Sequence, residues 1–107
     1  MEEKKLLLII NPVSGRMKMS TAAFDVVKVF SDAGYLVTVQ MTRGRGDATK
    51  MIRRMGAAYD LVVVCGGDGT LNEGMAGLIE GGHDIPIGYI PCGTTNDFAA
   101  SLGLERE

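Results

Sequence analysis

The chain has 107 residues, a formal net charge of −2 and a pI near 5.3, so it is sized for one small domain and lacks the basic surplus of a nucleic-acid-binding face. Hydrophobic residues make up 46% and charged residues 22%, as in ordinary globular proteins, and no stretch has the length of a transmembrane helix. The first ten residues are not a secretory signal, because acidic residues stand beside the lysines and the apolar run is short.

The first part of the chain predicts a strand, a helix and a second strand. Residues 6–10 are continuously apolar, as in a strand that is covered on both faces. Residues 20–33 predict a helix that stops at Gly34, and residues 36–41 alternate in polarity, which favours a strand nearer the sheet edge. The apolar stripe of the helix is formed by Ala23, Phe24, Val27 and Phe30.

The middle of the chain repeats this alternation. Residues 47–58 predict a helix with Asp47 as its N-cap, and residues 61–65 predict a second fully apolar strand. The apolar stripe of this helix is formed by Ala48, Met51, Ile52 and Met55, and we expect the methionines to fill the core.

The last part predicts helix, strand and helix. Residues 70–80 form a helix that stops at Gly81-Gly82, residues 85–90 form the fourth strand, and residues 95–102 form a short final helix. Leu71, Met75 and Leu78 make the stripe of the longer helix, and we interpret His83 as a solvated loop residue.

This alternation predicts an α/β fold with three layers, in which helices cover both faces of a parallel sheet. Right-handed crossovers with one reversal of winding give the strand order 2-1-3-4. The first and third strands are then neighbours, and ligands of open α/β sheets bind in the crevice outside the carboxyl ends of such strands.

The strand at residues 61–65 runs into a glycine-rich turn, and Thr70 opens the helix that follows. This arrangement favours phosphate, because free backbone N–H groups and the helix dipole both point at an anion. Gly66, Gly67 and Gly69 would let phosphate oxygens approach the backbone, and the Thr70 hydroxyl would cap the helix and donate to the ligand.

Two side chains of the first helical turn have different expected roles. We expect Asn72 to reach the ligand and Glu73 to favour the helix dipole.

Asp68 is the unusual member of this turn, because a carboxylate repels phosphate unless a cation lies between them. The simplest cation is Mg²⁺ carried by a nucleotide, which makes Asp68 the predicted metal ligand. The alternative is a turn-forming aspartate that bonds its own backbone.

Two further loops support a site at this edge. Asn11 to Arg16 follow the first strand, and residues 91–99 follow the fourth. The side chains of Asn11 and Ser14 suit ribose or phosphate hydrogen bonds, and Gly15 permits a close approach. Arg16, Arg43 and Arg45 would add positive charge near the anion or remain solvated.

The triple Asn-Pro-Val-Ser-Gly, Gly-Gly-Asp-Gly-Thr and Pro-Cys-Gly-Thr-Thr-Asn-Asp-Phe-Ala resembles the diacylglycerol kinase catalytic domain family, which includes related sphingosine and ceramide kinases. Gly-Gly-Asp-Gly-Thr alone is shared with NAD kinases, whereas the combination is typical of the lipid kinases. The resemblance implies the NAD kinase/diacylglycerol kinase-like N-terminal fold, ATP and Mg²⁺ as cofactors, and diacylglycerol or a similar lipid as acceptor.

The resemblance also assigns individual residues. It implies that Thr42 and Thr94 contact the nucleotide, and that Asn96 and Asp97 line the acceptor side of the cleft. Family members continue into a β-rich second domain that supplies lipid contacts and the acceptor-activating residue. We therefore expect residues 1–107 to be the nucleotide-binding domain of a lipid kinase, inactive alone, with the catalytic residue itself unassigned.

The alternatives are a non-catalytic nucleotide-binding module and an NAD kinase-like domain. Two cysteines, Cys65 and Cys92, do not form a disulfide framework, which favours free thiols in the cytoplasm. We expect the full enzyme to act peripherally at the inner face of the membrane, without nucleic acid. We also expect self-association through the fourth strand or the adjacent helix face, because a bare strand edge recruits partners.

Overall fold

The computed structural model describes residues 3–12 and 19–91, and gives the backbone alone for residues 19–22. Strands and helices alternate along the chain, and a short 3₁₀ helix, η2, directly follows the second α-helix. In chain order they are β1 (Lys4–Ile10), α1 (Met19–Asp32), β2 (Tyr35–Met41), α2 (Asp47–Met55), η2 (Gly56–Ala58), β3 (Leu61–Gly66), α3 (Asp68–Gly81) and β4 (Ile87–Pro91).

The four strands form one parallel sheet in the order β2-β1-β3-β4. This confirms the predicted topology, including the edge position of β2. In the register, Ile10 lies opposite both Met41 of β2 and Cys65 of β3, while Gly66 lies opposite Pro91 of β4. The strands therefore end together, and the loops that follow them share one edge of the sheet.

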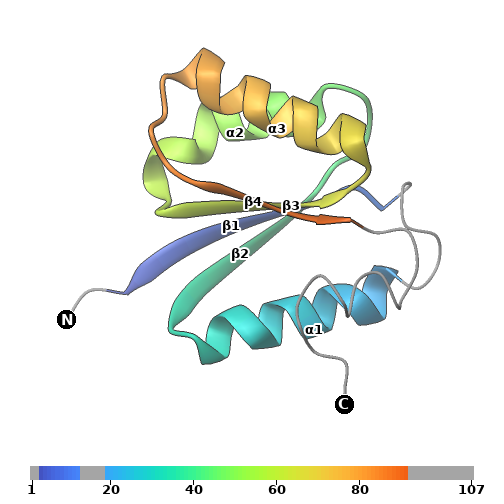
Figure 1. The fold of residues 1–107 in the computed structure, drawn as a ribbon, viewed down its shortest axis with the longest axis vertical. Helices are drawn as coiled ribbons and strands as arrows, with labels where there is room; N and C mark the ends of the chain where they lie inside the picture. The colour runs from blue at the N-terminus through green and yellow to red at the C-terminus, as the bar shows by residue number, and fades with distance from the viewer. Residues whose placement is uncertain (1–2, 13–18, 92–107) are drawn as a thin grey trace.

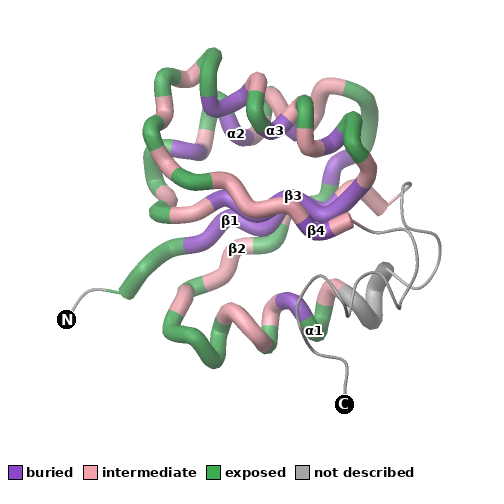
Figure 2. Tube along the Cα trace, viewed as in Figure 1, coloured by how far each residue is buried: buried purple, intermediate pink, exposed green. Residues whose placement is uncertain are grey.

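Helices cover both faces of the sheet, with α1 on one face and α2 and α3 on the other (Figure 1). Side chains of β1 and β3 alternate between the two faces, so each strand contributes to two cores. On the α1 side, Leu6, Leu8 and Ile10 pack with Val26 of the helix. The opposite core contains Leu7, Ile9, Ala48, Ile52, Val62, Val64 and Leu78. Burial on both faces explains the continuous apolar runs, and Figure 2 shows the buried band along β1 and β3.

Two predicted core positions are wrong. Phe24 is 71% exposed, and Val26, not in the predicted stripe, is fully buried in its place. Met75 of α3 is 45% exposed, unlike the two methionines of α2, which pack against the core. In α1 and in α3, the helical face that meets the sheet is therefore rotated from the face predicted from the large apolar side chains.

Helix starts also differ from prediction. α3 begins at Asp68 with Gly67 as its N-cap, so Thr70 is the third helical residue rather than the cap. Gly46, with φ of 87°, is the N-cap of α2, and the Asp47 carboxylate accepts a hydrogen bond from the Arg43 N–H at 2.7 Å instead of capping the helix. A glycine suits the left-handed conformation at this cap because it has no Cβ.

His83, in the turn before β4, is half-buried, whereas the sequence predicted a solvated loop residue. Its Nε2 lies 3.0 Å from the carbonyl oxygen of Arg53, near the end of α2. A Cβ placed on Gly56 or Gly81 would meet the imidazole ring at 2.6 or 2.4 Å, so the ring packs against both backbones. Beside this ring, α2 ends at Met55 and η2 begins.

The fourth strand starts at Ile87, two residues later than predicted. Pro86, directly before it, has no N–H to donate to a neighbouring strand.

α2 and α3 pack closely because two glycines of α3 face α2 and the sheet. A Cβ on Gly77 would lie 2.8 Å from the Thr49 carbonyl oxygen and 2.9 Å from Ile52 Cβ, and one on Gly74 would lie 3.0 Å from Ile87 Cδ1. These contacts bring α3 near enough to α2 for the two helices to share polar contacts.

No helix in the described part of the chain has the length and apolar character needed to cross a membrane.

We predict that Gly77→Ala lowers the free energy of unfolding by about 1–3 kcal/mol, because the added methyl group meets the backbone of α2 rather than a movable side chain. Gly69→Ala in the same helix is the matched control. It meets nothing within 4 Å and should be neutral or stabilising by roughly 0.5–1 kcal/mol, because alanine favours helix. Urea unfolding measures both, and equal stability of the two variants would contradict the packing account.

Candidate functional site

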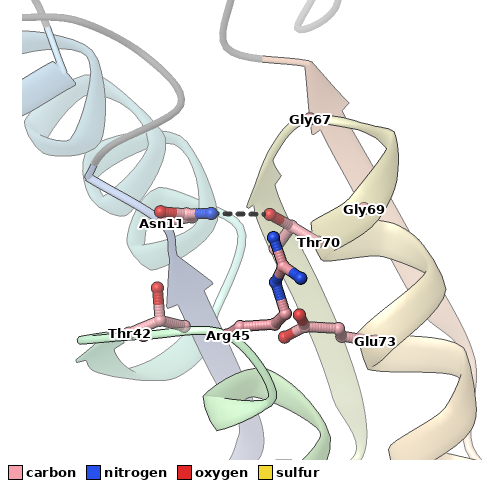
Figure 3. Close-up of a pocket in the computed structure, with 8 residues that line it drawn as sticks. Asn11, Thr42, Arg45, Gly67, Gly69, Thr70 and Glu73 are labelled. Atoms are coloured by element: carbon pink, nitrogen blue, oxygen red, sulfur yellow. Dashed lines mark hydrogen bonds between the residues drawn. The ribbon is translucent and has the colours of Figure 1, made fainter.

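A cavity of about 400 Å³ opens at the carboxyl edge of the sheet. It lies where the ends of β1 and β2 meet the start of α3. Its lining residues are Asn11, Thr42, Gly44, Arg45, Gly67, Gly69, Thr70 and Glu73 (Figure 3). Thr42 and Thr70 are 6% and 4% exposed and are the buried polar side chains recorded in the described part of the chain. Both lie in this cavity, so the buried polar side chains of the described residues gather at one place.

Strand alternation delivers the first wall of the cavity. Asn11 continues the side of β1 that carries Leu7 and Ile9, which is the side covered by α2 and α3. The Asn11 N–H donates to the Cys65 carbonyl at 2.9 Å, and the Thr42 N–H donates to the Ile10 carbonyl at 2.8 Å. The sheet hydrogen bonds therefore continue to the site itself and hold both residues in register.

The glycine-rich turn delivers the second wall. Asn11 Nδ2 donates to Thr70 Oγ1 at 3.0 Å and joins the end of β1 to the first turn of α3 (Figure 3). A Cβ on Gly66 would lie 2.5 Å from that Oγ1 and 3.2 Å from Asn11 Cβ. Glycine at this position is thus required by a close approach of β3, Asn11 and Thr70.

The third wall is the loop between β2 and α2, which is fastened to α3 by Glu73. Glu73 Oε2 accepts a hydrogen bond from the Gly46 N–H at 3.0 Å, and the Glu73 carbonyl accepts one from Thr49 Oγ1 at 2.7 Å. Glu73 lies three residues after Thr70 and therefore on the same helical face. The two bonds fix the distance between the loop that carries Arg45 and the helix N-terminus.

Charges of both signs line the cavity. Arg45 extends from the loop toward Asn11 and Thr70, and the Glu73 carboxylate lies near the base of its side chain (Figure 3). The first-turn N–H groups of α3 supply further positive potential, because they lie at the helix N-terminus. An arginine together with a helix N-terminus suits an anionic ligand such as a phosphate ester.

Asp68 lies on the other side of the glycine-rich turn, toward β4. It is exposed and is not among the lining residues. Its Oδ1 lies 3.4 Å from the hydroxyl of Tyr89, which also donates to the Gly66 carbonyl at 3.2 Å. As the first residue of α3, Asp68 also favours the helix dipole. If Asp68 is not a metal ligand, its role is therefore to stabilise the start of α3, not to bond its own backbone in a turn.

The described residues contain no group of three or more His, Cys, Asp or Glu side chains that could hold a metal ion. Asp68 alone does not make a metal cage. A single exposed carboxylate does fit Mg²⁺ that arrives with phosphates and keeps several waters, because that ion is commonly held by one or two carboxylates plus substrate oxygens.

The structure brings Asn11, Thr42, Gly67, Gly69 and Thr70 of the predicted set around one cavity. Gly66 supports them from β3, Asp68 lies beside them toward β4, and Asn72 is exposed outside the cavity lining. Ser14, Gly15, Arg16, Cys92, Thr94, Asn96 and Asp97 lie outside the described residues.

Sequence reasoning gave Glu73 a different role, and it did not single out Gly44 or Tyr89. The spacing of Thr70 and Glu73 would have indicated that both share a helical face. Gly44 and Tyr89 become recognisable through the fold, which brings one to the cavity and the other to Asp68.

We predict that Glu73→Ala lowers the free energy of unfolding by about 1–2 kcal/mol and speeds amide exchange at Gly46, because that N–H loses its acceptor. Glu80→Ala removes the same charge from the same helix, but breaks only an exposed pair with Arg53, so it should cost less than about 0.5 kcal/mol. Urea unfolding and hydrogen exchange compare the two. If Gly46 exchanges at its original rate in Glu73→Ala, Glu73 does not fasten the loop.

Comparison with known proteins gives one consistent result. Residues 5–107 match the family model described as the diacylglycerol kinase catalytic domain. The chain is 40% identical over 105 residues to a diacylglycerol kinase of Bacillus subtilis, covering 97% of this chain and 35% of the relative. It is 39% identical over 101 residues to a diacylglycerol kinase of Staphylococcus haemolyticus, covering 94% and 31%.

Solved structures agree with the sequence comparison. A crystal structure of a diacylglycerol kinase from Bacillus anthracis superposes with a TM-score of 0.76 at 34% identity, covering 98% of this chain and 39% of that one. The chain thus spans about a third of the length of the curated relatives it matches.

Proposed function

The chain belongs to the diacylglycerol kinase catalytic domain family, and on that premise we propose that it is the nucleotide-binding part of an ATP-dependent lipid kinase. The complete activity would transfer the γ-phosphoryl group of ATP to the hydroxyl of diacylglycerol or a similar lipid. The observation that carries the proposal is the convergence of Asn11, Thr42 and residues 67–70 on one cavity at the carboxyl edge of a parallel sheet.

The arrangement supports one direction for the nucleotide. In the proposal, the nucleoside end occupies the cavity beside Thr42 and the loop of Gly44 and Arg45. The phosphates cross the glycine-rich turn, where the N–H groups at the start of α3 receive their charge. The γ-phosphoryl group then lies on the side of the turn that carries Asp68 and faces β4.

Phosphoryl transfer depends mostly on positioning and charge neutralisation. Asp68 would hold Mg²⁺, which would neutralise the negative charge of the phosphates. The chain's own contributions are the Thr70 hydroxyl, oriented by its bond from Asn11, and the Arg45 guanidinium, which faces the cavity. The loop bearing Arg45 stays in place through Glu73.

The acceptor side remains a proposal drawn from the family resemblance. Thr94 would contact the nucleotide, and Asn96 and Asp97 would line the path of the lipid. We propose that the acceptor-activating residue belongs to a part of the enzyme beyond residue 107, that the enzyme works at the inner surface of the membrane, and that residues 1–107 alone form no phosphatidic acid from ATP and diacylglycerol. Self-association through β4 or the neighbouring face of α3 is likewise a proposal.

We predict that residues 1–107 bind ATP more tightly with Mg²⁺ than with EDTA, and that Asp68→Asn removes roughly tenfold, or about 1.4 kcal/mol, of the Mg²⁺-dependent affinity. The amide keeps the shape of the side chain but loses the charge that attracts the cation. Isothermal titration calorimetry measures the four affinities.

Asp84→Asn is the control, because Asp84 is exposed in the turn before β4, at the opposite edge of the sheet. It should retain the affinity of the unmodified chain under both conditions. Equal Mg²⁺ enhancement in Asp68→Asn and the unmodified chain would remove Asp68 from the metal site. Absence of ATP binding to the unmodified chain at millimolar concentration would contradict the nucleotide-site proposal.

A further inference from the structure

Tyr89 is the one side chain of β4 recorded as reaching the glycine-rich turn among the residues that the structure describes. Its ring packs with Ile87 into the core under α2 and α3. Its hydroxyl lies 3.2 Å from the Gly66 carbonyl oxygen and 3.4 Å from Asp68 Oδ1. A residue of the edge strand therefore contacts both the last residue of β3 and the first residue of α3.

The two acceptors of the Tyr89 hydroxyl, the Gly66 carbonyl and the Asp68 carboxylate, differ in mobility, so the contact can restrict the orientation of Asp68. The Gly66 carbonyl is fixed by the sheet, and the ring of Tyr89 is held by the core, so the position of the hydroxyl is determined independently of Asp68. Asp68 is exposed, and its carboxylate has several staggered positions to choose from. The hydroxyl has one proton, which the Gly66 carbonyl and Asp68 Oδ1 share at 3.2 and 3.4 Å. The negative charge of the carboxylate makes it the stronger acceptor, so the fixed hydroxyl favours the position in which Oδ1 faces β4.

The second oxygen of Asp68 completes the arrangement. No other described residue is recorded as bonding Oδ2, so this oxygen remains available for a cation while Tyr89 holds Oδ1. Hydrogen bonds to the outer oxygen of a ligating carboxylate orient that ligand and strengthen metal binding.

We propose that Tyr89 is a positioning residue for Asp68: its hydroxyl orients the carboxylate toward Mg²⁺ carried by the nucleotide, and thereby couples β4 to the metal-dependent part of nucleotide binding. This inference rests on the proposed function. The competing explanation is that Tyr89 only fastens β4 to β3 through the Gly66 carbonyl, in which case its loss changes stability and leaves Mg²⁺ dependence alone.

Tyr89→Phe tests this directly, because it keeps the ring and removes only the hydroxyl. ATP affinity with EDTA should stay unchanged, while affinity with Mg²⁺ should fall roughly three- to tenfold, in the range of one ordinary hydrogen bond, because the contact to Asp68 Oδ1 is long at 3.4 Å. Tyr59→Phe is the matched control, since Tyr59 is half-buried in the same core and has no recorded bond to the turn. It should match the unmodified chain in both conditions.

A double-mutant cycle separates action through Asp68 from action through the backbone. If Tyr89 works through the carboxylate, Tyr89→Phe should have no further effect on Mg²⁺-dependent affinity once Asp68→Asn is present. Calorimetry with ATP and Mg²⁺, or with ATP and EDTA, gives the cycle, and far-UV circular dichroism confirms that each variant is folded. Additive losses, or equal losses with Mg²⁺ and with EDTA, would overturn the proposal.

The outcomes also separate this proposal from the function on which it rests. Mg²⁺-dependent binding in the unmodified chain and an unchanged Mg²⁺ enhancement in Tyr89→Phe would contradict the role of Tyr89 alone. No Mg²⁺-dependent ATP binding in the unmodified chain would contradict the proposed function, and the role of Tyr89 would fall with it.

Discussion

The parallel pairing of β1 with β3 is the constraint on which the site depends. Both strands are buried on both faces, so their alternating side chains are committed to two cores, and a slip of one residue would move every side chain into the opposite core. Because the strands run the same way, Asn11 and the glycine-rich turn emerge side by side. Their proximity lets Asn11 bond Thr70 across the crevice, a contact between residues 59 positions apart.

Packing between α2 and α3 fixes the wall of the cavity that the sheet does not form. The buried glycines of α3 let it approach α2 closely, and Glu73 converts that approach into hydrogen bonds with Gly46 and Thr49. The cavity thus has one wall held by the sheet and another held by helix packing. A ligand entering it meets groups that are already in place, which lowers the entropic cost of binding.

The sequence allowed the strand order and the shared edge of the site to be predicted, because continuous apolar runs, glycine stops and crossover handedness are local or topological signals. It did not reveal the true face of α1, since Phe24 and Val26 are both apolar and only packing chooses Val26. Thr70 was misplaced as a cap because the helix starts at Asp68, with Gly67, three residues before Thr70, as its cap. The roles of Glu73 and Tyr89 depend on partners 27 and 21–23 residues away, which no local pattern contains.

Titration of ¹⁵N-labelled residues 1–107 with ATP and Mg²⁺, followed by amide chemical shifts, tests the central claim most directly. The largest shifts should fall on Asn11, Thr42, Gly67, Gly69 and Thr70, which meet at the carboxyl edge of the sheet. Amides at the opposite edge, such as Tyr35, Leu61 and Ile87, should move little. Shifts centred on that opposite edge, or none at millimolar ATP, would contradict a nucleotide site at the ends of β1 and β3.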